Sequence, residues 1–212
     1  MSNKKKLILV GAGGHCKSCI EVIEAQNKYS IVGILDKQEK KGQKVFGYSI
    51  VGTDDDIESL ILKQYSFLVT VGQIKNFGLR KKLFERLKLK EAKLASIVSP
   101  AAKVSDYAEV GEGTVIMHGV TVNADAKVGV NCILNTNCTI EHEAHVGNHC
   151  HISTHAVVNG DCIVKDGCFI GSGSVLVNGV QIHPSVVIGA GSVVTKNIDQ
   201  AGTFVGSPAK KI

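Results

Sequence analysis

The sequence has no tryptophan, and aromatic residues make up only 5% of its 212 positions. Long basic runs are also missing, since Lys4 to Lys6 and the pair Lys81-Lys82 are short. Basic stretches with interleaved aromatic residues are the usual marks of nucleic-acid binding. We therefore expect no nucleic-acid partner. The net charge of +5 fits at most a mild preference for anionic metabolites.

No long hydrophobic run opens the chain. The apolar stretch Leu7 to Val10 is too short for a signal-peptide core or a membrane span. We expect a cytoplasmic protein with no membrane partner. Seven cysteines in that setting would suggest metal or redox chemistry if they clustered at ligand spacing.

A repeat of six residues is the strongest pattern in the sequence. Seventeen successive positions at this interval hold only Val, Ile or Leu: Val98, Val104, Val110, Ile116, Val122, Val128, Leu134, Ile140, Val146, Ile152, Val158, Val164, Ile170, Leu176, Ile182, Ile188 and Val194. Small residues follow four positions after each. This period matches neither a helix nor a long strand, and it is typical of short strands joined by tight corners. The repeat predicts a parallel β-helix.

Glycines recur at every third hexad, as at Gly111, Gly129 and Gly147. This spacing predicts that three hexads close one coil and that glycine occupies corners with positive φ. Asparagines such as Asn123 and Asn135 share one hexad position and are expected to adopt that conformation too. Stacked coils present flat outer faces, so we expect an oligomer.

Most of the cysteines follow the hexad pattern. Five occupy the small inward position and are interpreted as core residues: Cys132, Cys138, Cys150, Cys162 and Cys168. Cys16 and Cys19 form CKSC at the expected start of a helix, an arrangement similar to a redox motif. No tryptophan or proline accompanies that motif, which argues against a redox role.

Residues 1–93 are expected to form a small Rossmann-like α/β domain, and residues 94–212 the β-helix. Strands at residues 7–10 and 31–35 flank a turn at 11–14 and a helix to about residue 26. The further elements expected are a segment near Ile50, a helix capped by Asp54, a strand at 66–72, and an amphipathic helix with Leu79, Leu83 and Leu87.

The loop GAGGHC follows the first strand. Cys16 stands where a dinucleotide fingerprint has its third glycine, which weakens an NAD-dependent interpretation. Backbone N–H groups at the start of a helix can still bind a phosphate. A nucleoside diphosphate would fit, with Asp36 placed to meet the ribose. A tight turn without a ligand is the alternative.

Histidines concentrate in IEHEAHVGNHCHIS, residues 140–153. None of them occupies an inward hexad position, so we expect them on corners or outer faces. No two histidines here are three hexads apart, so no metal site is expected within one chain; zinc held between chains is an alternative. His142, between Glu141 and Glu143, fits a general base whose ring is oriented by a carboxylate.

Several motifs together resemble one family. GAGGH, the small α/β domain, the unbroken hexads, IEHE and the terminal GSPAK are similar to the bacterial hexapeptide-repeat sugar acyltransferases. That family includes nucleotide-aminosugar N-acetyltransferases and the sialic acid O-acetyltransferase group. The resemblance implies a left-handed β-helix, a homotrimer, acetyl-CoA as donor without a metal, and active sites between neighbouring β-helices.

The resemblance also implies catalytic roles. His142 matches the base and Glu143 the acid that orients it. Asn135 and His151 match residues near the acetyl end of CoA. Gly160 matches the residue whose backbone N–H faces the thioester carbonyl.

Binding roles follow from the same resemblance. The loop that holds the phosphates of the nucleotide sugar matches Gly13, Gly14 and His15, and Asp36 falls near the nucleoside. Lys210 and Lys211 in the terminal stretch match positions along CoA, with a solvated basic tail as the alternative. His145 and His149 have no assigned role.

The resemblance thus implies an N-acetyltransferase that acts on the amine of a nucleotide-linked amino-dideoxysugar in bacterial surface glycan or glycoprotein synthesis. Transfer is expected to be direct, because the inward cysteines would be poor nucleophiles. O-acetylation of a sugar hydroxyl, as in sialic acid, is the main alternative. A β-helical zinc enzyme and a non-catalytic scaffold are the others.

Overall fold

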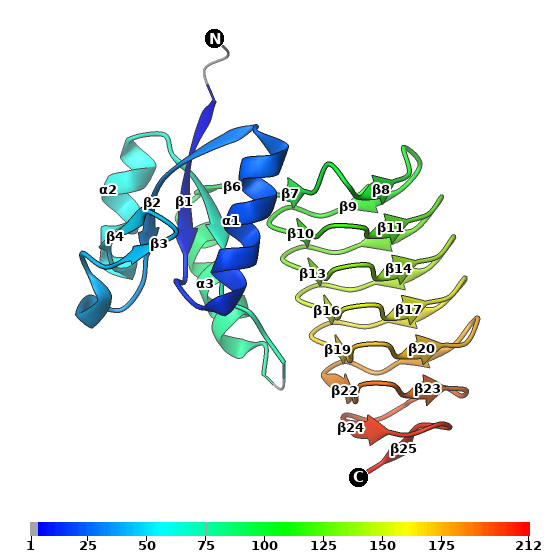
Figure 1. Ribbon diagram of the computed structural model, residues 1–212. Helices are drawn as coiled ribbons and strands as arrows, with labels where there is room; N and C mark the ends of the chain where they lie inside the picture. Colours follow the sequence, from blue (N-terminus) through cyan, green and yellow to red (C-terminus); the bar gives the residue numbers. More distant parts are fainter. Residues whose placement is uncertain (1–3, 75) are drawn as a thin grey trace. The chain divides into compact units, whose positions relative to one another are not determined.

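The structure is a computed structural model that describes residues 4–74 and 76–212 (Figure 1). The chain divides into two compact units. The first contains the chain up to Gly72 together with Gly78–Pro100, and the second contains Gln73–Phe77 and Ala101–Ile212. No described helix is both long and apolar enough to cross a membrane.

The first unit is an α/β domain that combines one β-sheet with helices. Its sheet has the order β3-β4-β2-β1-β5-β6, in which β3 and β4 form an antiparallel hairpin and the other pairs are parallel. The elements are β1 (Lys5–Val10), α1 (Gly14–Gln26), β2 (Tyr29–Leu35), β3 (Lys44–Val45), β4 (Tyr48–Gly52), α2 (Ile57–Leu62), β5 (Ser66–Val69), α3 (Gly78–Leu89), β6 (Lys93–Leu94) and β7 (Ile97–Val98), with short 3₁₀ turns at Gln38–Lys40 and Asp54–Asp56.

The βαβ interpretation of the chain as far as Leu35 is confirmed. The side chains of β1 from Leu7 to Val10 are buried, as expected for a central parallel strand covered on both faces. Helix α1 buries Cys16, Cys19 and Ile20. The CKSC pair therefore lies in the hydrophobic core.

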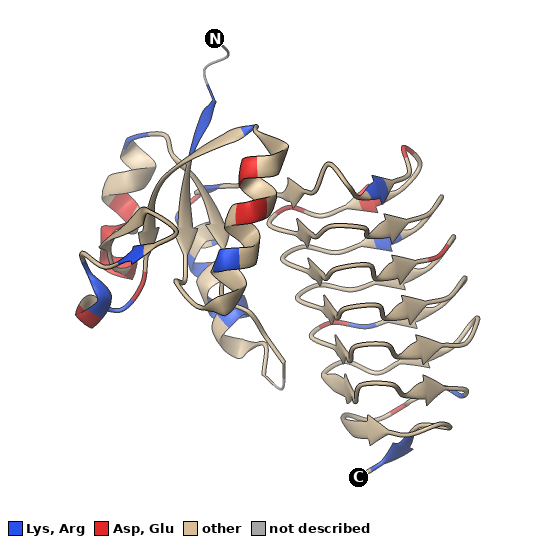
Figure 2. Ribbon diagram, viewed as in Figure 1, with Lys and Arg blue, Asp and Glu red and all other residues tan. Residues whose placement is uncertain are grey.

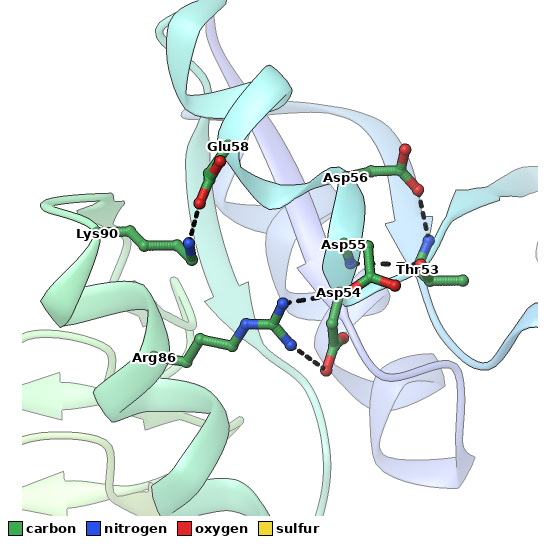
Figure 3. A network of polar contacts seen from close by, with 7 residues as sticks. All are labelled: Thr53, Asp54, Asp55, Asp56, Glu58, Arg86 and Lys90. Carbon is green, nitrogen blue, oxygen red and sulfur yellow. Dashed lines mark hydrogen bonds and ion pairs between the residues drawn. The ribbon is translucent and has the colours of Figure 1, made fainter.

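Two details of the later helices differ from the sequence prediction. Thr53, and not Asp54, caps the turn before α2: its side chain accepts from Asp55 N at 3.3 Å, while Asp56 accepts from Thr53 N at 2.9 Å (Figure 3). In α3, Leu83 and Leu87 are buried, but Leu79 is 61% exposed.

Ion pairs connect α3 to the residues around α2. Figure 3 shows Arg86 reaching Asp54 at 3.5 Å and Asp55 at 3.3 Å, and Lys90 reaching Glu58. These groups are largely solvent-exposed, and such pairs contribute little to stability individually. Burial of Leu83 and Leu87, and the hydrogen bonds that buried Arg80 donates to the carbonyl oxygens of Val69 and Val71, contribute more to holding α3 in place.

The second unit is a parallel β-helix, visible in Figure 1 as a stack of coils. Its strands are β8 (Lys103–Val104), β9 (Glu109–Val110), β10 (Val115–Ile116), β11 (Thr121–Val122), β12 (Lys127–Val128), β13 (Ile133–Leu134), β14 (Thr139–Ile140), β15 (His145–Val146), β16 (His151–Ile152), β17 (Val157–Val158), β18 (Ile163–Val164), β19 (Phe169–Ile170), β20 (Val175–Leu176), β21 (Gln181–Ile182), β22 (Val186–Ile188), β23 (Val193–Val194), β24 (Gly202–Val205) and β25 (Lys210–Lys211).

Three sheets form the faces of the coils. Each strand from β8 to β23 pairs in parallel with a strand three hexads away, as Ile133 does with His151 and His151 with Phe169, whereas β24 and β25 pair antiparallel. Three hexads therefore close one coil, as predicted. The repeating aliphatic residues are buried from Ile116 onward, whereas Val98, Val104 and Val110 near the open first coil are half-buried.

The expectation about corner glycines is wrong. Gly111, Gly129 and Gly147 do not have positive φ; they lack a side chain because the next coil lies too close. A Cβ at Gly111 would stand 2.6 Å from the backbone of Gly129. The left-handed conformation occurs instead at the third residue of every corner from residues 111–114 to residues 189–192, for example Asn137, Glu143 and His155, and not at Asn123 or Asn135. Asn, Asp and His adopt it more readily than most residues.

Candidate active site

His142 and Glu143 form a pair on one corner of the β-helix, between β14 and β15. His142 Nδ1 lies 3.0 Å from Glu143 Oε2. A carboxylate only accepts hydrogen bonds, so Nδ1 carries a proton, and in the neutral ring Nε2 has the lone pair. The two side chains are 60% and 65% exposed. This corner therefore presents an oriented, accessible base to solvent.

Gly160 lies directly beside that base, one coil further along the chain. It is buried, and a Cβ at this position would stand 2.8 Å from His142 Cε1 and 3.0 Å from Nε2. Its backbone N–H has no hydrogen-bond partner among the described residues. A missing side chain and a free donor next to Nε2 make a place where a carbonyl oxygen can bind.

Asn135 and His151 form a second cluster of polar side chains. Asn135 lies on the corner after β13, and His151 lies on the face, in β16. His151 Nδ1 lies 2.6 Å from the carbonyl oxygen of Gln73, and its Nε2 lies 3.2 Å from Asn135 Nδ2. The carbonyl requires the proton on Nδ1, so Nε2 accepts from the Asn135 amide. The ring of His151 thus connects the Gln73 carbonyl group to the Asn135 side chain.

The segment Gln73–Phe77 belongs to the same unit as the β-helix. It explains why the prediction of exposed histidines is wrong at two positions. His149 and His151 were expected at the surface, yet they are only 8% and 7% exposed. The Gln73 side chain donates to the carbonyl oxygen of His149 at 2.7 Å, and Asn131 Nδ2 lies 3.0 Å from His149 Nδ1. Nothing in the sequence around Gln73 signals this role.

The glycine loop lies between β1 and α1. Gly13 and Gly14 are exposed, and a Cβ at either would meet nothing within 4 Å. Helix α1 has no side-chain cap at Gly13 and no acidic residue in its first turn. His15 Nε2 lies 3.5 Å from Cys19 Sγ. An uncapped helix start with open glycines suits an anion such as a phosphate.

Asp36, at the end of β2, holds this loop in place. Its carboxylate accepts from Ala12 N at 2.6 Å and Lys37 N at 2.8 Å, and it pairs with Lys40 at 3.1 Å. Burial alone would raise the pKa of Asp36, but these hydrogen bonds and the Lys40 charge outweigh burial and hold that pKa below its ordinary value. Asp36 therefore supports the conformation of the glycine loop through the Ala12 N–H.

The β-helix cysteines are unsuited to nucleophilic chemistry. All five are buried, with no exposed surface. Burial raises the pKa of the Cys138, Cys150 and Cys162 thiols, which disfavours the reactive thiolate. A hydrogen bond with Cys150 lowers the pKa of the Cys168 thiol, but that side chain has no exposed surface. Across residues 4–74 and 76–212, no group of three or more His, Cys, Asp or Glu side chains is arranged to hold a metal ion.

Lys210 and Lys211 form β25 at the C-terminal end of the chain, where Figure 2 shows a basic segment. Both are exposed, and Lys211 Nζ donates to Gln200 at 3.0 Å. Their charges are accessible to an anionic ligand.

Comparison with known proteins identifies the family. The PglD N-terminal domain family matches residues 6–87, the GlmU-like C-terminal hexapeptide family residues 90–155, and the bacterial transferase hexapeptide family residues 161–196. The acetyltransferase domain of PglB from Neisseria gonorrhoeae is 30% identical, with a TM-score of 0.92 over 99% of this chain and 100% of that one. The chain belongs to the hexapeptide-repeat sugar acyltransferases. The predicted fold, a Rossmann-like α/β domain followed by a left-handed parallel β-helix, is confirmed.

Other members of this family have been solved with ligands. The same Neisseria domain is known in complex with acetyl coenzyme A. PerB from Caulobacter crescentus, in complex with CoA and GDP-perosamine, is 29% identical, with a TM-score of 0.91 over 98% of this chain and 97% of that one. A curated relative, the UDP-N-acetylbacillosamine N-acetyltransferase of Bacillus subtilis (strain 168), is 36% identical over 115 residues. That match spans 53% of this chain and 51% of the relative, about half the length of each.

Proposed function

We propose that this protein transfers the acetyl group of acetyl-CoA to the amine of a nucleotide-linked amino-dideoxysugar, for bacterial surface glycan or glycoprotein synthesis in the cytoplasm. The observation that carries the proposal is the corner at which His142 Nε2 faces the open Gly160 backbone while Nδ1 is held by Glu143. The relatives with bound CoA, acetyl-CoA or GDP-perosamine support the same chemistry.

Each residue of this corner has one task in the transfer. The neutral amine attacks the thioester carbonyl carbon, and His142 Nε2 accepts the proton that the amine loses. The Gly160 N–H donates to the carbonyl oxygen as negative charge develops there. The carbon–sulfur bond then breaks, and the proton on His142 passes to the departing CoA sulfur. Glu143 stabilises the imidazolium that forms between these steps.

The α/β domain would bind the nucleotide. In the proposed complex, the N–H groups at Gly13 and Gly14 and the ring of His15 meet the phosphates, and Asp36 keeps the loop in shape beside the nucleoside. The assignment of residues 1–93 to the nucleotide sugar and of residues 94–212 to acetyl-CoA and catalysis is part of the same proposal.

The proposed assembly is a homotrimer. Asn135 opens the corner at residues 135–138, whereas His142 lies on the next corner, at residues 141–144. A site that uses both the base and the acetyl-end residues Asn135 and His151 therefore calls for two neighbouring β-helices. Lys210 and Lys211 would bind the phosphates of CoA.

Mass spectrometry of reaction products tests the proposal. The protein is incubated with acetyl-CoA and a panel of UDP-, dTDP- and GDP-linked 4-amino-4,6-dideoxysugars. A gain of one acetyl group on one panel member is expected, and it identifies the nucleotide in the same step. Acetyl-CoA that binds without any acetylated aminosugar, together with acetylation of free sialic acid, would refute amine transfer in favour of a hydroxyl acceptor.

A further inference from the structure

His142 belongs to a column of corner residues that stack on one another in successive coils of the β-helix. Strands β14, β17 and β20 pair in parallel at an interval of three hexads. The corner residues that follow these strands therefore stack at the same interval. Ala124, His142, Gly160 and Asn178 occupy this column. Side chains are accommodated above and below Gly160, so the backbone of this corner does not require glycine. Its missing side chain leaves a notch between His142 and Asn178.

The notch is bordered by two nitrogen atoms. A Cβ at Gly160 would lie 3.0 Å from His142 Nε2 and 3.2 Å from Asn178 Nδ2. Asn178 is exposed, and its amide makes no hydrogen bond within the part of the chain that the structure describes. The N–H of Gly160 is likewise free there. Two donors without a partner among the described residues and one base thus lie around a space without a side chain.

We propose that Asn178 is a further catalytic residue, whose Nδ2 donates a second hydrogen bond to the thioester carbonyl oxygen beside the Gly160 N–H. This inference rests on the proposed acetyl transfer. An amide side chain cannot take the amine proton at neutral pH, so its role complements that of His142. It supplies a neutral donor where the oxygen becomes negative as the amine adds to the carbonyl carbon.

A stabilising role in the fold does not account for the Asn178 side chain. The same corner position holds Ala124 in one coil and Gly160 in another, and the left-handed residue that follows is Gly179, with φ of 75°. The corner therefore forms without an amide at this position. An exposed amide adjacent to the base is available for the substrate instead.

Steady-state kinetics of two variants test the inference. Asn178→Ala removes the donor and should lower kcat about 10- to 100-fold while both KM values change less than about threefold. Asn178→Asp keeps the size but replaces the donor with a carboxylate that repels the developing oxyanion. Its kcat should fall below that of Asn178→Ala. Rates are compared on the pH plateau of each variant.

Ser172→Ala is the matched control. Ser172 occupies the same corner position on another edge of the β-helix and is exposed. Within the described residues its hydroxyl contacts only Ser153 Oγ, at 2.9 Å. It should retain the wild-type rate. A wild-type kcat in Asn178→Ala, a wild-type kcat in Asn178→Asp, or an effect confined to the KM of the acceptor would each overturn the inference.

Hydrolysis of acetyl-CoA by water separates this inference from the proposed function. The same oxyanion forms when water attacks, so Asn178→Ala should slow CoA release, measured by liquid chromatography, by a similar factor. If the wild type acetylates no aminosugar, the proposed acceptor is wrong, and the hydrolysis ratio still decides the role of Asn178. Equal hydrolysis by wild type and Asn178→Ala would overturn it.

Discussion

Gly160→Ala should greatly slow the enzyme without unfolding it. The added Cβ would stand 2.8 Å from His142 Cε1 and 3.0 Å from Nε2. The ring would have to retreat by roughly 0.7 Å to reach an ordinary contact distance. His142 is 60% exposed and can move into solvent at little cost. Gly160 does not have positive φ, so alanine introduces no backbone strain.

The expected loss in kcat/KM is about 100-fold, because displacements near 1 Å at a reacting group have effects of that size. The free energy of unfolding should stay within about 1 kcal/mol of wild type, since removing a glycine also reduces the entropy of the unfolded chain. Product formation measured by mass spectrometry gives the rate, and urea titration gives the stability. A well-folded Gly160→Ala protein with wild-type kcat/KM would refute the proposed geometry of the site.

Three further outcomes follow from the described contacts. Glu143→Gln should lower kcat about tenfold in the acetyl-transfer assay, because the ring stays oriented but the imidazolium loses its counter-charge; an unchanged kcat would contradict this. Asp36→Asn should cost about 2 kcal/mol at pH 7 by urea titration. The pKa of Asp36 is lowered in the folded state, so this contribution is present above the unfolded pKa and should disappear as the pH falls through the folded value; a constant difference would contradict the linkage. Cys162→Ala should keep kcat within about threefold of wild type, whereas loss of turnover would indicate an acyl-enzyme.

The coils of the β-helix could be predicted because the pattern that specifies each coil lies within its own hexads. Each hexad places its own aliphatic residue inward, and the interval of three hexads in the sequence is the interval of strand pairing. Which corner residue adopts positive φ was not predictable from glycine spacing. Close approach between coils selects glycine at Gly111 and Gly129, while Glu143 and His155 adopt the left-handed conformation.

The candidate site could be predicted only where its residues carry a motif. His142 and Glu143 lie next to each other in the sequence, and their pairing follows directly from IEHE. The burial of His151 depends on Gln73, far earlier in the chain, and no periodicity connects the two. Asn178 belongs to no motif, and its position beside His142 appears only when coils are stacked in register.

The catalytic role of His142 is the central claim, and kcat/KM of His142→Ala tests it most directly. With the aminosugar acceptor identified, the variant should lose about 1,000-fold in kcat/KM while acetyl-CoA binding and the unfolding midpoint stay at wild-type values. Near-normal turnover by a folded His142→Ala protein would contradict the account, because no other proton acceptor is assigned to the amine.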